Sequence, residues 1–156
     1  MSRSLVLALA LCGLITQGCG GRNSHARHLT RLYRATRHLD ASVSTGTTYN
    51  QYSAEVADAF AAFLIAQDHA QGSDKVLLDE YRPLLQKHQD ALYIWGLDIN
   101  RGKGDESRLI QIEQTYGMHP EDSSGDMFSY FRNLLWLKTA EDEKKIIPEL
   151  LGATNR

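Results

Sequence analysis

Apolar side chains recur at steps of three and four residues through most of the chain after position 19, and no long stretch alternates apolar with polar residues. The first pattern places apolar side chains along one side of an α-helix, whereas a half-buried β-strand requires alternation. The spacing therefore predicts an all-α fold. We expect a four- to five-helix antiparallel bundle, because short connections keep sequential helices adjacent in space.

Capping residues mark the starts of the first two expected helices. Ser24 and Thr48 can each accept a hydrogen bond from a free backbone amide at a helix start. The first helix should end near residue 43 and the second at the turn around Gly72. Residues 42–48, mostly Ser and Thr, are expected to break the first helix. A strand is the alternative for this run, but a lone strand would have nothing to pair with.

Prolines shape the later helices. The third expected helix, residues 73–99, meets Pro83, which lacks an amide hydrogen and should kink the helix or restart it. After a glycine-containing loop, a shorter helix is expected over residues 107–116. The last helix, over residues 126–147, should end before Pro148.

The expected core positions share helical spacing within each of the long segments, which is typical of bundle interiors. They are Leu29, Leu32, Tyr33, Thr36, Leu39 and Val43; Tyr52, Val56, Ala59, Phe60, Phe63 and Leu64; Leu84, Leu85, His88, Leu92, Trp95 and Ile99; and Phe128, Phe131, Leu134, Leu135 and either Leu137 or Lys138.

Residues 1–18 have the features of an export signal. Arg3 gives a positive start, and residues 5–15 carry no charge. This run has 11 residues, whereas a membrane-spanning helix needs about 20. We therefore expect a cleaved signal helix before the bundle. Two alternatives stay open: a secreted product cut at another position, and a buried amino-terminal helix.

Residues 14–19, with the sequence LITQGC, resemble the lipobox of bacterial prolipoproteins, in which a small residue, here Gly18, precedes the cysteine that is acylated. Thr16 stands where that family usually has leucine. The resemblance implies a lipid, such as palmitate, on Cys19 and an anchor in the cell envelope, facing the periplasm. Gly20, in place of aspartate, implies retention in the outer membrane if the host has two membranes.

Cysteine usage agrees with this organisation. Cys12 would leave with the signal, so Cys19 has no partner for an intramolecular disulfide. Residues 19–24 are then expected to form the lipid-attachment tether, and residues 25–156 the helical bundle domain. A chain of this length can bury a sufficient core without disulfides.

Charge is divided unequally along the chain. Residues 22–39 contain five arginines and three histidines and no carboxylate. The chain from position 40 onward has 11 of the 17 lysines and arginines and all 19 carboxylates, a balance of −8. The near-neutral total therefore hides a basic first helix and an acidic remainder.

Arg27, Arg31, Arg34 and His38 share a narrow sector of the first helix, opposite its apolar side. Beside a lipid anchor they can contact an anionic membrane surface or a partner, and each arginine would contribute about 1 kcal/mol at such a surface. The alternative is an ordinary bundle helix with solvated or paired arginines. Nucleic-acid binding is not expected, because an exported and otherwise acidic domain offers no second basic surface.

His88 and Trp95 are the candidate ligand contacts. His88 occupies an apolar helical position, so a cavity lined by it and nearby aromatic side chains would suit a small ligand or cofactor. The alternative is a hydrogen-bonded histidine at the core edge. His25 and His28 stand three residues apart, but zinc takes three or four ligands and no third is near. No metal site and no cofactor are predicted.

Motifs of covalent haem attachment, di-iron bundles and zinc metalloproteases are missing from the sequence. Residues 90–95 and 134–136 resemble small exported bacterial helical proteins that are themselves uncharacterised, which implies a helical fold and no particular activity. We predict a lipid-tethered, non-catalytic envelope domain that acts through protein contacts, as an accessory or structural component. The first alternative is a periplasmic bundle that binds a small ligand or cofactor. An enzyme of unrecognised chemistry is the second alternative.

Overall fold

The structure, a computed structural model, describes residues 20–154, and over residues 20–26 the backbone alone. This part of the chain forms five α-helices and one short 3-10 helix. In chain order they are α1 (Gly20–Thr45), α2 (Tyr49–His69), α3 (Ser73–Ile99), α4 (Glu106–Tyr116), η1 (Pro120–Asp122) and α5 (Met127–Thr154). The expected signal segment and Cys19 lie outside the described residues.

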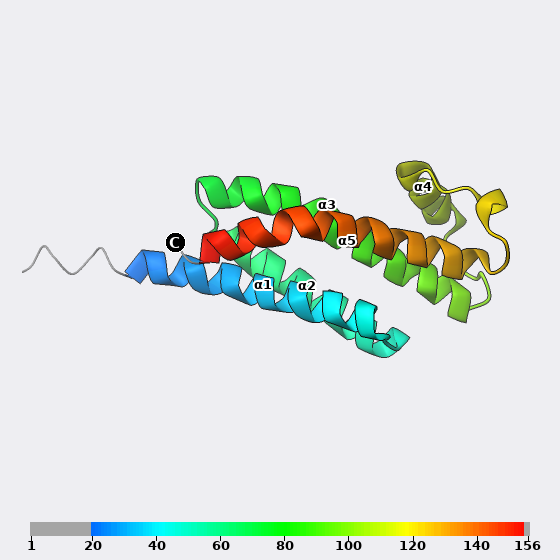
Figure 1. The fold of residues 1–156 in the computed structure, drawn as a ribbon, viewed down its shortest axis with the longest axis horizontal. Coiled ribbons are helices and arrows are strands. Elements are labelled where there is room, and N and C mark those ends of the chain that lie inside the picture. The colour runs from blue at the N-terminus through cyan, green and yellow to red at the C-terminus, as the bar shows by residue number, and fades with distance from the viewer. Residues whose placement is uncertain (1–19, 155–156) are drawn as a thin grey trace, which may run out of the picture.

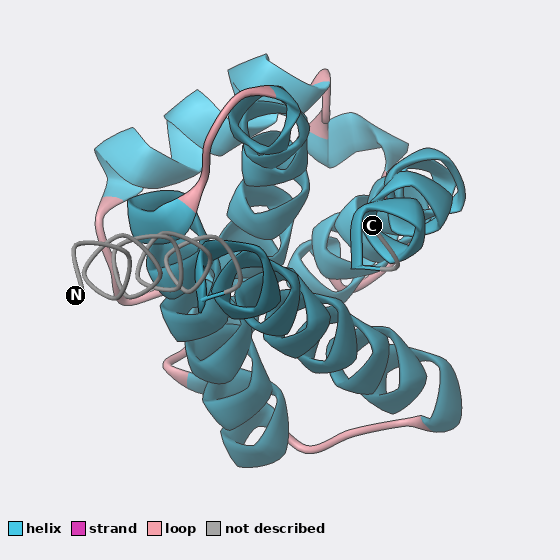
Figure 2. Cartoon of the chain, turned by 90° about the vertical axis from the view of Figure 1, so that its left-hand side faces the viewer, coloured by secondary structure: helices cyan, strands magenta, loops and turns pink. Residues whose placement is uncertain are grey.

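The four long helices form a closed antiparallel ring. α1 packs against α2, α2 against α3, α3 against α5, and α5 against α1. Successive long helices run in opposite directions, and α4 lies at one end of the molecule (Figure 1). A view along the bundle shows helices joined by loops, with no strand in the described residues (Figure 2). The predicted all-α antiparallel bundle is therefore confirmed.

Local signals fix several helix ends. Thr48 caps α2 as predicted, because its side-chain oxygen accepts a hydrogen bond from the Gln51 amide at 3.3 Å. Asp105 caps α4 by accepting a hydrogen bond from the Ser107 amide at 3.0 Å. α4 ends at Gly117, whose φ of +61° is a left-handed conformation that glycine adopts at little cost.

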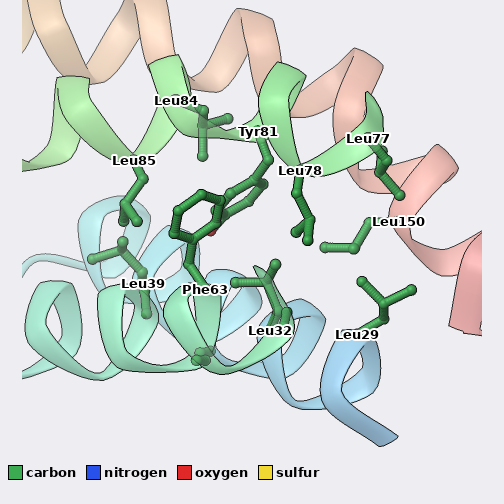
Figure 3. Close-up of a cluster of buried hydrophobic side chains, with 14 of the residues drawn as sticks. Leu29, Leu32, Leu39, Phe63, Leu77, Leu78, Tyr81, Leu84, Leu85 and Leu150 are labelled. Atoms are coloured by element: carbon green, nitrogen blue, oxygen red, sulfur yellow. The ribbon is translucent and has the colours of Figure 1, made fainter. Parts of the chain in front are cut away.

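The larger core cluster joins all four long helices. Leucines of α1, α3 and α5 surround the rings of Phe63 and Tyr81 (Figure 3). These two rings stack with centroids 5.8 Å apart. The buried Tyr81 hydroxyl lies 2.6 Å from the Thr36 hydroxyl, so the polar atom at the centre of this cluster keeps a hydrogen-bond partner.

A smaller core cluster joins α3, α4 and α5. Ala91 and Ile94 of α3 meet Phe131 and Leu135 of α5, and all four are fully buried. Ile112, which is 3% exposed, is the buried residue of α4. Helix α4 is therefore attached through Ile112, through the partly buried Leu109 and Tyr116, and through the buried Met118 just after its end.

Both prolines within helices are tolerated, contrary to the expectation that Pro148 ends the last helix and that Pro83 can restart the third. α3 runs unbroken through Pro83, and α5 continues past Pro148. Both prolines are exposed, so water can solvate the carbonyl that each leaves unpaired. Beyond Pro148, Leu150 is fully buried and Ala153 is 6% exposed. Burial of these side chains favours the continued helix.

α1 is longer than predicted at both ends. Its backbone is already helical at Gly20, so Ser24 is not the N-cap. At the other end, the hydroxyls of Ser44 and Thr45 donate to the Ala41 carbonyl at 2.9 and 2.8 Å. These bonds continue the helix through most of the Ser- and Thr-rich run, and the expected break is confined to the three residues before α2.

Four residues expected in the core are exposed instead. They are Phe60 (38%), Leu64 (44%), Ile99 (55%) and Leu137 (60%). Lys138, the alternative to Leu137, is half-buried. Helical spacing identifies apolar positions, but it does not tell which side of a broadly apolar helix faces the interior. The two exposed residues of α2 matter most, because each lines a hollow between α2 and α3.

Candidate functional site

A hollow of about 580 Å³ lies between α2 and α3. Its walls are mostly apolar and aromatic, with a smaller number of polar side chains among them. The lining residues are Tyr49, Ser53, Val56, Ala57, Phe60, Gln89, Leu92, Tyr93, Gly96, Leu97, Asn100, Lys103, Gly104 and Arg108.

Gly96 lets Tyr49 approach α3 closely. A Cβ atom at position 96 would stand 3.3 Å from the Tyr49 hydroxyl, which is tighter than ordinary contact. The Tyr49 ring also meets Trp95 edge-on, with centroids 5.9 Å apart. Glycine within a helix costs about 1 kcal/mol relative to alanine. Here it allows an aromatic side chain to form part of the wall.

The loop after α3 closes one end of the hollow and brings two cations there. Lys103 and Arg108 line this end. The Arg108 guanidinium lies over the Tyr93 ring, 4.2 Å from its centroid, and 3.6 Å from a carboxylate oxygen of Asp90. The loop backbone packs directly on α3 at Gly104, where a Cβ would overlap a leucine side chain.

A second hollow of about 260 Å³ continues along the same two helices. It shares Phe60 and Gln89 with the first hollow and extends to Leu64 and Arg82. We call the two together the α2/α3 groove. It follows α3 from Arg82 to Asn100, a length of about 27 Å at 1.5 Å per residue.

The α2/α3 groove has an unusual charge pattern for this chain. No carboxylate lines either hollow, although the chain from position 40 onward has a balance of −8. Arg82 lies at one end of the groove, and Lys103 and Arg108 at the other. The groove is therefore lined by more apolar than polar side chains, with Gln86 and Gln89 between its ends and cations at both ends. Arg82 and Arg108 each also lie 3.6 Å from a carboxylate outside the lining, that of Asp79 and that of Asp90.

α2 has a second apolar side that borders this groove. Ala57, Phe60, Ala61 and Leu64 follow the spacing i, i+3, i+4 and i+7, and all four are exposed. Helices that are apolar around most of their circumference are usually covered on every side. Within residues 20–154, no element covers this side of α2.

A buried polar cluster lies inside the bundle. The Tyr52 hydroxyl accepts a hydrogen bond from Trp136 Nε1 at 3.0 Å and lies 2.9 Å from His88 Nδ1. His88 is 2% exposed. Its Nε2 lies 3.4 Å from Glu143 Oε1, and neither atom has a hydrogen bond among the described residues. The cluster joins α2, α3 and α5 through one tyrosine hydroxyl.

Burial controls ionisation in this cluster. It lowers the pKa of His88 to about 3, so the imidazole is neutral at neutral pH. Burial also raises the pKa of Glu143 to about 8, and the charge and hydrogen bond of Asp40 add to the effect. A carboxyl with this pKa can exchange a proton near neutral pH. The adjacent His88 offers almost no surface to a substrate, whereas Glu143 lines a surface hollow of about 290 Å³ together with Asp40.

Trp95 lies in an aromatic group beside the same tyrosine. Its ring centroid is 5.9 Å from that of Tyr52 and 5.7 Å from that of Trp136. The Arg132 guanidinium covers both indole rings, at 4.6 and 5.2 Å from their centroids. The structure therefore brings His88 and Trp95 together around Tyr52, and neither of them lines the α2/α3 groove.

A separate hollow of about 530 Å³ lies between α1 and α2. It is lined by Arg27, Thr30, Arg31, Arg34, Ala35, His38 and Asp58, and we call it the α1/α2 hollow. All four basic residues that the sequence places on one side of the first helix line this hollow and are exposed.

The sequence did contain a signal for the α2/α3 groove. The spacing of Ala57, Phe60, Ala61 and Leu64 is as regular as that of the buried side of α2. Helical spacing alone assigned Phe60 and Leu64 to the core, since one sequence cannot rank two apolar sides. Lys103 and Arg108 reach the groove through the path of a loop, which has no periodic pattern to predict it.

Two features are absent from the described residues. Among the described side chains, no group of three or more His, Cys, Asp or Glu lies close enough to hold a metal ion. Within residues 20–154, no helix combines the length and the hydropathy that a membrane crossing requires.

No protein family, no curated protein and no solved structure matches the chain. The fold and the grooves described above are therefore the basis for assigning a function.

Proposed function

We propose that this chain is a lipid-tethered helical domain of the bacterial cell envelope that binds a protein partner in the α2/α3 groove, as an accessory or structural component. The signal-like residues 1–18 and the lipobox-like Cys19 support the location, and Gly20 favours the outer membrane. The α2/α3 groove is the observation that carries the binding role. It is long, has more apolar than polar side chains and no carboxylate among its lining residues, and has cations at both ends.

The partner that fits is an amphipathic α-helix with acidic residues near both ends. A helix of about 18 residues spans 27 Å, which is the length of the groove. Apolar side chains at i, i+3, i+4 and i+7 of such a helix would pack on Phe60 and Leu64. Carboxylates at its ends would lie near Arg82 on one side and near Lys103 and Arg108 on the other. Charge complementarity of this kind fixes register and speeds association.

In vivo photocrosslinking tests the partner site. A photoreactive amino acid replaces Leu64 beside the groove or, as a matched control, Leu137 on α5; these leucines are 44% and 60% exposed. We expect one protein adduct of defined mass from position 64 and none from position 137. Mass spectrometry of that adduct should identify an acidic amphipathic helix as the crosslinked segment. Lys103→Glu combined with Arg108→Glu should reduce the adduct at least tenfold.

Equal adducts from both positions, or a crosslinked segment without helical apolar spacing, would contradict the site. The tether is tested separately by Cys19→Ser. This variant should move the protein from the membrane fraction to the soluble fraction. Continued membrane association would contradict lipidation and would leave the groove assignment unaffected.

A small amphipathic ligand is the second candidate for the same groove. Its larger hollow, about 580 Å³, falls within the range of small-molecule sites, roughly 300–1,000 Å³. Tyr49 and Tyr93 provide aromatic walls, and Lys103 provides a cation. Native mass spectrometry of the purified protein distinguishes the candidates. A bound mass of a few hundred daltons that is lost in Phe60→Ser would favour the ligand over the helix.

A further inference from the structure

The α1/α2 hollow contains more positive charge than its surroundings neutralise. Arg31 lies 3.6 Å from Asp58, the one carboxylate among the lining residues. Arg27, Arg34 and His38 have no hydrogen bond or ion pair with a described side chain. Arg37, on the other flank of α1, differs because it binds Asp40 at 2.9 Å.

The spacing of these residues makes the excess charge unfavourable in the free protein. Arg27 and Arg31 stand four residues apart, and Arg31 and Arg34 stand three apart. Like charges at these spacings are neighbours on a helix and destabilise it. An anion between α1 and α2 would relieve this repulsion, so binding and stability should rise together.

The side-chain chemistry selects for phosphate. The cations at the N-terminal and central positions of the hollow are all arginines, whose planar guanidinium groups bind phosphate oxygens in pairs and are weakly hydrated. Thr30 and His38 add polar groups to the same walls. A hollow of about 530 Å³ has room for a phosphate with its organic substituent.

We infer that the α1/α2 hollow binds the phosphate group of an anionic phospholipid headgroup. This inference rests on the proposed location for its source of phosphate, because α1 follows position 19 directly and its helical backbone begins at Gly20. A lipid on Cys19 would hold the arginine side of α1 within reach of the bilayer surface. The negative surface potential would then add to the specific contact.

Thermal unfolding of the purified exported protein tests the site. The protein is kept in micelles of an uncharged detergent, and short-chain phosphatidylglycerol, short-chain phosphatidylcholine or inorganic phosphate is added. We expect phosphatidylglycerol to raise Tm by about 5–10 °C at a hundredfold excess over Kd. Inorganic phosphate at the same concentration should raise Tm less than half as much, and phosphatidylcholine should leave it unchanged.

A triple variant, Arg27→Gln, Arg31→Gln and Arg34→Gln, should lose this rise in Tm. The control removes the same charge elsewhere, through Arg37→Gln, Lys144→Gln and Lys145→Gln, and should keep the rise. Asp58→Asn provides a test that does not depend on the triple variant folding. It removes the one carboxylate of the hollow, so Kd for phosphatidylglycerol should fall about threefold.

Each contrary result overturns the inference in a recognisable way. An equal response to inorganic phosphate would assign the site to the free anion, and an equal response to phosphatidylcholine would indicate an apolar effect. Loss of the response in the control would indicate net charge alone, and a weaker affinity in Asp58→Asn would contradict the site itself. Because the micelle measurement does not depend on the tether, a failed fractionation result for Cys19→Ser leaves it valid.

Discussion

The α1/α2 hollow and the α2/α3 groove border opposite flanks of one helix and differ in chemistry far more than in size. Their main volumes are about 530 and 580 Å³. The hollow receives Asp58 from α2 and a row of cations from α1, whereas the groove receives Phe60, only two residues further along α2, and cations at its ends alone. Asp58 and Phe60 stand two residues apart and therefore point to opposite sides of α2, one towards the ionic hollow and the other towards the apolar groove. The two hollows have similar volumes, so the difference in what they could bind comes from the side chains that line them.

The largest effect is expected where the two surfaces share a support. Tyr52 holds α2 to the interior through Trp136 and His88. Tyr52→Phe leaves both buried partners without that hydrogen bond, so the free energy of unfolding should fall by about 3 kcal/mol. Urea unfolding measures this loss. Below the unfolding transition, the variant should still bind phosphatidylglycerol in the α1/α2 hollow and the partner in the α2/α3 groove. Loss of only one of these two activities in a folded variant would show that Tyr52 does not support both surfaces.

A pH series tests whether the buried cluster of Tyr52, His88 and Glu143 keeps the same contribution to stability at each pH used to compare the two surfaces. The pKa of His88 is about 3 in the folded protein against an ordinary 6.5, so stability falls as pH drops from 6.5 towards 3. The pKa of Glu143 is about 8 against an ordinary 4.5, so stability falls as pH rises from 4.5 towards 8. The two slopes oppose each other between pH 4.5 and 6.5, where stability should be nearly flat.

Glu143→Gln should remove the alkaline part of this dependence. Between pH 6.5 and 8 the wild type should lose about 2 kcal/mol of unfolding free energy relative to the variant. Urea unfolding of both proteins at the two pH values measures the difference. Parallel losses in both proteins would show that another group titrates.

Salt should separate the two surfaces directly. Raising the ionic strength from about 0.05 to 0.5 M shortens the Debye length severalfold. Binding of phosphatidylglycerol in the α1/α2 hollow should weaken at least tenfold, since it depends on exposed charges. The photocrosslink from position 64 should fall less than this affinity does, because apolar burial, which salt does not screen, adds there to the contacts of Lys103 and Arg108. Equal salt dependence at both surfaces would remove the distinction.

The smallest expected effect is confined to the groove. In Gly96→Ala the new Cβ would press on the Tyr49 hydroxyl at 3.3 Å and narrow the aromatic end. The crosslink yield from position 64 should fall about threefold, with no loss of stability, because alanine favours the helix. The response to phosphatidylglycerol should stay at the wild-type value. A change in both would point to a shift of α2 as a whole.

The helices could be predicted from the sequence because each carries its own local signal. Thr48 marks the start of α2, and the spacing of Leu29, Leu32 and Leu39 marks the buried side of α1. The end of α5 could not be predicted from the sequence. Pro148 is a local signal for a helix to end, whereas the helix continues because residues beyond it are buried against other helices. Leu150 fits a gap made by three other helices, and no window of sequence contains that gap.

The two surfaces differ in the same respect. One wall of the α1/α2 hollow could be predicted from the sequence, because Arg27, Arg31 and Arg34 lie on one helix at helical spacing. The contribution of Asp58 from the neighbouring helix α2 could not be predicted. The α2/α3 groove depends on two helices and a loop, and Lys103 reaches it only through the loop's path. Sites built from one helix can be found by spacing, whereas sites built between elements require coordinates.

The burial of Leu150 and Ala153 also bears on how long the folded protein can last. Both residues belong to the buried cluster that contains Leu29 and Leu77, and Figure 3 shows Leu150 between these two leucines. Loss of the last turn of α5 would leave a cavity in this cluster and would expose Leu29 and Leu77 to solvent. A chain with this turn unwound would be open to proteolysis there, so the persistence of the folded protein depends on the packing of Leu150 and Ala153.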